Sequence, residues 1–166
     1  REKIIISLFV KLFTKKYVDT KIGITAPELD VKCFNEKLSI KTITGLVGPK
    51  LIWTVDSVKA KEFVDNYSPE CSIILVIIDW VKKTDKGGFY YIPEKAQKRI
   101  FKNLGKEYFK LPKSGTNPRG VEMSNEALKK ILDEKDVMKI SINWKKQNLN
   151  YDPLTKWLDE WNNLEI

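Results

Sequence analysis

The stretch from Ser72 to Trp80 is an almost unbroken run of apolar residues, and it constrains the fold more than any other feature of the chain. The run is much shorter than a membrane span needs, and it is too uniformly apolar for a strand with one solvated face. It therefore predicts a central strand that is covered on both faces, as in sheets flanked by helices.

Helical and strand patterns alternate around this run. Apolar residues three and four positions apart predict helices over residues 1–15, 57–66, 93–105, 125–134 and 152–161. Alternating or β-rich stretches predict strands over residues 21–24, 28–34, 38–43, 50–55, 89–92 and 137–144. Asp56 and Ser124 are the expected N-caps of two helices. We expect an α/β fold with a mixed central β-sheet flanked by helices, in a single domain over residues 1–166. The sequence does not begin with Met, so truncation at the N-terminus is an open alternative.

The residue types that are missing restrict the chemistry. The chain has no His, which excludes Ser-His and Cys-His catalysis and zinc sites with His ligands. Cys33 and Cys71 each lie in an apolar, strand-like stretch, so we expect two buried reduced thiols and a cytoplasmic protein of a prokaryote. No apolar run is long enough for a membrane span, so we expect no membrane partner. Any catalysis has to use carboxylates, lysines, hydroxyls and hard metal ions.

The charge of the chain is unevenly distributed. Its formal net charge is +8, and residues 95–146 hold fourteen Lys or Arg against six Asp or Glu, while the remaining sixteen of each sign cancel. A localised basic surface attracts polyanions through release of counterions, which favours nucleic acid as the partner. Solvated lysine-rich surfaces are the ordinary alternative.

A predicted hairpin combines acidic and basic side chains. Because side chains alternate along a strand, Glu28 and Asp30 share one face of its first strand, and Ser39 and Lys41 share one face of its second. A carboxylate there can bind Mg²⁺, and a nearby lysine can orient the attacking water and offset charge in a phosphoryl transition state. Read alone, the hairpin is equally an edge hairpin with ordinary surface charges.

The hairpin resembles the PD-(D/E)xK nuclease superfamily. Residues 27–30, PELD, stand where the first half of the motif is expected, and residues 39–41, SIK, stand where the second half is expected. The blocks SIKTITG, KLIWTVD, GGFYYIP and GTNPRGVEMS are similar to small type II restriction endonucleases and extend the resemblance from Glu28 to Met123. The sequence departs from the pattern at Ser39, where an acid is expected.

The resemblance implies a Mg²⁺-dependent endonuclease that cuts double-stranded DNA at a short sequence. Asp30 and Lys41 are the expected core of the site, and Asp30 is the expected metal ligand. The second carboxylate is expected from Glu28 on the same strand or from Glu2 on the first helix. A symmetric DNA site would favour a homodimer, because protein symmetry then mirrors site symmetry.

Residues 113–119, KSGTNPR, form the expected DNA-reading loop. Arg119 can donate two hydrogen bonds to guanine, and the other polar side chains of the loop can reach bases or phosphates: Lys113, Ser114, Thr116 and Asn117. Lys50 and Lys110 are expected phosphate contacts. The alternative is a surface turn in which Arg119 pairs with Glu122. Trp53 and the aromatic residues 89–91 are expected in the core.

Two other functions remain open on the sequence. The chain could be a non-catalytic DNA-binding module, for which the missing acid at Ser39 is the best support. It could also be a repair or junction nuclease of the same superfamily, which would lack base-specific contacts.

Overall fold

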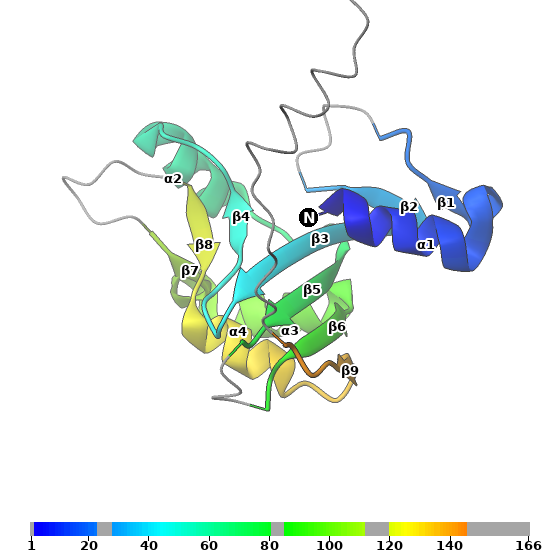
Figure 1. Ribbon diagram of the computed structural model, residues 1–166. Helices are drawn as coiled ribbons and strands as arrows, with labels where there is room; N and C mark the ends of the chain where they lie inside the picture. Colours follow the sequence, from blue (N-terminus) through cyan, green and yellow to red (C-terminus); the bar gives the residue numbers. More distant parts are fainter. Residues whose placement is uncertain (1, 23–27, 81–84, 112–119, 146–166) are drawn as a thin grey trace, which may run out of the picture.

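The computed structural model describes residues 2–22, 28–80, 85–111 and 120–145, and its centre is a six-stranded sheet (Figure 1). In spatial order its strands are β1 (Val18–Asp19), β2 (Val31–Cys33), β3 (Glu36–Thr44), β5 (Ser72–Ile78), β6 (Gly88–Ile92) and β9 (Met138–Ser141). The strands β3 and β5 run parallel, and every other neighbouring pair is antiparallel. The predicted mixed sheet is therefore confirmed, with the apolar run of residues 72–78 at its centre.

Helices cover both faces of this sheet. In the described residues these are α1 (Glu2–Tyr17), α2 (Ser57–Asn66), α3 (Glu94–Leu104) and α4 (Asn125–Leu132), with a 3-10 helix at Gly105–Tyr108. On one face, Ile5 of α1 packs with Ile40 and Val76. On the other face, Ile43 and Leu75 belong to a larger core that includes α3 and α4. Alternate residues of β3 thus point into two different cores.

A second, smaller sheet packs on the larger core. Its order is β4 (Lys50–Ile52), β8 (Val121–Met123) and β7 (Phe109–Lys110), and Figure 1 shows it beside α2. Leu51 and Val121 of this sheet and Ala60 of α2 are buried in the same core as Ile43. The small sheet and α2 therefore lie on the Ile43 side of the central sheet. Because it joins segments about seventy residues apart, the sequence did not predict this sheet.

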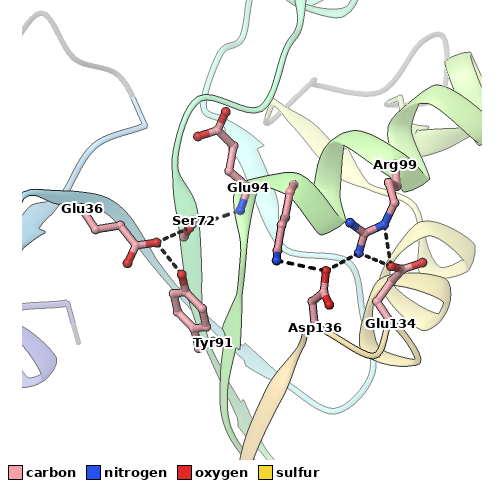
Figure 2. A network of polar contacts seen from close by, with 8 residues as sticks. Glu36, Ser72, Tyr91, Glu94, Arg99, Glu134 and Asp136 are labelled. Atoms are coloured by element: carbon pink, nitrogen blue, oxygen red, sulfur yellow. Dashed lines mark hydrogen bonds and ion pairs between the residues drawn. The ribbon is translucent and has the colours of Figure 1, made fainter.

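Polar contacts fix where β5 begins (Figure 2). The Ser72 hydroxyl donates to Glu36 Oε1 at 2.6 Å, and the Tyr91 hydroxyl donates to the same oxygen. The backbone N–H of Glu94 donates to Ser72 Oγ at 3.2 Å. These bonds tie β3, β5, β6 and α3 together at one end of the sheet, directly after Cys71.

Several local predictions are confirmed. Asp56 Oδ1 accepts from two N–H groups of α2, and Ser124 Oγ accepts from Ala127 N, so both are N-caps. Cys33 and Cys71 are buried free thiols. None of the helices in the described ranges is long and apolar enough to cross a membrane.

Other predictions are wrong or fall outside the described residues. Residues 21–22 are not in a strand, and residues 23–24 lie outside the described part. The strand expected over residues 28–34 is limited to 31–33. Trp53 is 64% exposed and not in the core, because β4 ends at Ile52, whereas Tyr90 is buried as expected. The helix expected over residues 152–161 lies outside the described residues.

Candidate active site

Asp30 lies where pairing between β2 and β3 ends. The pairing of β2 with β3 extends from Cys33 back to Val31, which lies opposite Leu38. Beyond it, Asp30 Oδ2 accepts a hydrogen bond from Ile40 N at 2.6 Å and one from Ser39 Oγ at 3.3 Å. Such bonds to a charged acceptor are stronger than neutral ones. The carboxylate thus replaces a backbone acceptor and is held in one orientation against β3.

Lys41 shares the face of β3 that carries Ser39. Its register partner is Leu75, whose side chain lies in the larger core, and the flanking residue Ile40 points to the opposite core. Lys41 is half-buried. Its ammonium group acts on the Glu28 carboxyl, because it lowers the pKa of Glu28 against the effect of burial. The Lys41 ammonium and the Glu28 carboxyl are therefore close enough to interact electrostatically, although Glu28 lies outside β2.

Glu28 is held in an unusual environment for a carboxyl group. Its Oε1 is buried and has no hydrogen-bond partner among the residues that the structure describes, and its backbone oxygen accepts from Cys71 Sγ at 3.7 Å. Burial raises the pKa of Glu28 to about 7, Lys41 opposes this, and the carboxylates of Glu70 and Asp30 raise the pKa further. A carboxyl group that titrates near neutral pH in a concave site is a candidate for function.

An aromatic layer formed by Tyr67 and Tyr108 lies near Glu28. Tyr67 is 8% exposed and Tyr108 is fully buried, and the two rings lie 5.8 Å apart between centroids. Burial raises the pKa of both hydroxyl groups, and the Glu28 carboxyl adds to the effect at each. Glu28 therefore faces a layer that remains uncharged at ordinary pH.

Glu70 is a residue that the sequence analysis missed. It lines a pocket of about 240 Å³ together with Glu28, Leu29, Lys37, Phe63, Asn66, Tyr67, Ser68 and Cys71. Glu70 precedes β5, and the register pairs Ser72 with Leu38 on β3. Because parallel strands begin at the same edge of a sheet, Glu70 lies near the hairpin only through the pairing of β5 with β3, and the sequence carries no local signal for this pairing.

The other expected site residues are not joined to this cluster. Glu2 is exposed on α1, which packs on the opposite face of the sheet from Lys41. Lys50 lies on β4, where its Nζ is 4.3 Å from the centroid of the Trp53 ring. The five polar and basic residues of the expected reading loop lie outside the described residues: Lys113, Ser114, Thr116, Asn117 and Arg119.

The pattern of acids limits how a metal could be held. Within the described ranges, no three His, Cys, Asp or Glu side chains converge as a metal site. The hairpin itself offers two carboxylates to an ion, those of Asp30 and Glu28. Mg²⁺ is commonly held in this way, with waters and substrate phosphates as its remaining ligands.

Comparisons with known proteins show that the chain is similar to restriction endonucleases. A protein-family model described as "Restriction endonuclease ThaI" matches residues 1–163. A solved structure described as "Restriction endonuclease in complex with substrate DNA" is 51% identical in sequence, with a TM-score of 0.87. The match covers 97% of this chain and 77% of that chain. No curated protein matches.

Proposed function

The chain belongs to the ThaI restriction endonuclease family and is a type II site-specific deoxyribonuclease, and we propose that it hydrolyses double-stranded DNA with Mg²⁺ held at the β2–β3 hairpin. The observation that carries this proposal is the meeting of Asp30, Glu28 and Lys41 at one end of the hairpin. A non-catalytic DNA-binding module would not need a half-buried carboxyl beside a lysine.

The residues present fit a magnesium ion. Within the described part of the chain, no group forms a hydrogen bond with the buried Glu28 Oε1, and the two bonds that fix Asp30 both use Oδ2. We propose that Asp30 and Glu28 supply the two protein oxygens. A bound Mg²⁺ would polarise the phosphate and lower the pKa of a water molecule. Glu2 is the weaker candidate for the second oxygen, because α1 packs on the other face of the sheet.

Lys41 is the proposed positioning and charge-neutralising group. Its ammonium interacts with Glu28, so it lies where an incoming phosphate would meet the carboxylates. There it can donate a hydrogen bond to the attacking water and offset the negative charge that develops on phosphorus. The products implied by this chemistry are a 5′-phosphate and a 3′-hydroxyl.

The remaining parts of the proposal concern assembly and DNA reading. We propose that residues 113–119 and Lys50 contact the DNA, that residues 1–166 form one nuclease domain, and that two copies act as a homodimer on a symmetric site. The free thiols of Cys33 and Cys71 support a reducing compartment, the cytoplasm. Sedimentation of the protein with and without DNA tests the dimer.

The decisive experiment uses methylation-free phage DNA. We expect discrete fragments with Mg²⁺, none with EDTA, and at least a hundredfold slower cleavage by Lys41→Ala. Lys11→Ala, which removes an exposed lysine from α1, is the control and should cut like the wild type. Intact DNA with wild-type protein under every Mg²⁺ concentration would contradict the proposal. Uniform degradation without fixed fragments would instead favour a junction or repair nuclease.

A further inference from the structure

Trp53 is a large aromatic side chain that the protein leaves in solvent. It directly follows β4 and is 64% exposed, and Val55 two residues later is 62% exposed. Isolated exposed apolar residues are common and need no explanation. Trp53 differs from them because Lys50 Nζ lies 4.3 Å from the centroid of its ring. This cation–π contact holds a positive charge over a flat apolar surface.

The position of Trp53 relates it to the proposed DNA-reading loop. Gly120 is the residue that follows the loop, and its φ is +105°. A Cβ atom at Gly120 would lie 1.9 Å from the Ile52 carbonyl oxygen and 3.1 Å from Trp53 Cα. Gly120 is therefore packed directly against the backbone of Ile52 and Trp53, and only glycine permits this approach.

Trp53 also lies on the side of the central sheet that carries the active site. Leu51 of β4 and Ala60 of α2 are buried in the same core as Ile43 and Leu75. Lys41 pairs with Leu75 and shares its face of the sheet. DNA that reaches Lys41 from this side of the central sheet therefore also approaches β4 and Trp53.

The local charges distinguish DNA from a protein partner. Glu122 lies between Lys50 and Lys110 in the register of the small sheet, and its Oε2 pairs with Lys110 Nζ at 3.0 Å. Lys50 is directed to the Trp53 ring instead. The cores of protein–protein interfaces are depleted of lysine. A lysine held over an exposed indole is better suited to a polyanion with apolar sugar and base edges.

We propose that Trp53 is a DNA-contacting residue, and that its indole packs against sugars and base edges while Lys50 binds the adjacent phosphate. This inference rests on the proposed function and extends it to a specific surface. Apolar and aromatic contacts of this kind add to affinity, whereas the lysine contact adds the salt-dependent part.

The test measures binding to a DNA duplex that contains the cleavage site mapped on phage DNA, with Ca²⁺ in place of Mg²⁺. We expect Trp53→Ala to weaken binding about tenfold and Trp53→Phe to recover most of the loss. Lys50→Ala should reduce the slope of log affinity against log salt by about one. Ile140→Ala, which removes another exposed apolar side chain (70% exposed) from β9, is the control.

Two results would overturn the inference while the nuclease function stands. One is wild-type affinity and salt dependence in Trp53→Ala. The other is a loss of dimer by sedimentation in Trp53→Ala, with unchanged DNA affinity per subunit, which would assign the side chain to a subunit interface. Failure of the proposed function is distinguishable, because the wild-type protein itself would then neither cut nor bind the DNA.

Discussion

Replacing Glu28 with Gln should make the metal-free protein more stable at alkaline pH and at the same time inactivate it. The folded chain raises the pKa of this carboxyl from 4.5 to about 7. One pKa unit corresponds to about 1.4 kcal/mol, so ionised Glu28 costs the folded state about 3 kcal/mol, and partial exposure reduces this to about 2 kcal/mol. A neutral amide of the same shape avoids that cost.

The sign of the pH dependence follows from proton binding. Between pH 4.5 and about 7 the folded chain retains the Glu28 proton while the unfolded chain loses it. The free energy of unfolding therefore falls as pH rises through this range and is level above it. We expect Glu28→Gln to match the wild type near pH 4.5 and to exceed it by about 2 kcal/mol at pH 8.

Urea unfolding followed by tryptophan fluorescence in EDTA, at pH 5 and pH 8, measures this difference. The contributions of other titrating groups to the free energy of unfolding cancel, because the wild type and the variant are compared at the same pH. Glu62→Gln, on the exposed side of α2, is the matched control and should change stability equally at both pH values. The reasoning is refuted if Glu28→Gln also shows the same difference at pH 5 and pH 8.

Three further substitutions test the surroundings of the site. Asp30→Asn keeps an acceptor for β3, so we expect a loss of about 1 kcal/mol in urea unfolding but at least a hundredfold slower cleavage. Gln97→Ala removes the buried amide that donates to the backbone oxygens of Cys71, just before β5, and of Ile92, the last residue of β6, and calorimetry should show a loss of about 2 kcal/mol. Gly120→Ala forces a Cβ against the Ile52 carbonyl, so urea unfolding should show a loss above about 2 kcal/mol, whereas Gly105→Ala meets no atom within 4 Å and serves as the matched positive-φ control.

The parts of the fold that the sequence predicted are those set by local rules. The short, uniformly apolar run at residues 72–78 favoured a doubly covered strand, and Asp56 and Ser124 are caps because their side chains reach N–H groups two or three residues away. The hairpin was predictable for the same reason, since its strands are joined by a short turn.

The parts that escaped prediction depend on contacts between distant segments. The pairing of β4 with β8 joins Lys50 to Glu122, and no local pattern specifies it. Trp53 was expected in the core because aromatic residues favour strands, but the strand ends one residue before it. Glu70 is close to Glu28 only because β5 is inserted beside β3, which no spacing in the chain reveals.

Ser39 is the position where the chain departs from the motif, and its surroundings explain the departure. It is 1% exposed and its hydroxyl donates to Asp30 Oδ2. An acid there would place a second buried carboxylate against Asp30, and like charges in a low-dielectric site raise the cost of ionisation. The serine hydroxyl instead donates a hydrogen bond that helps to fix the Asp30 carboxylate, and we propose that Glu28 supplies the second carboxylate. That carboxyl is half-buried with a raised pKa, so its full ionisation at neutral pH requires more positive charge than Lys41 provides. We therefore expect ionisation of Glu28 to be coupled to binding of the proposed Mg²⁺.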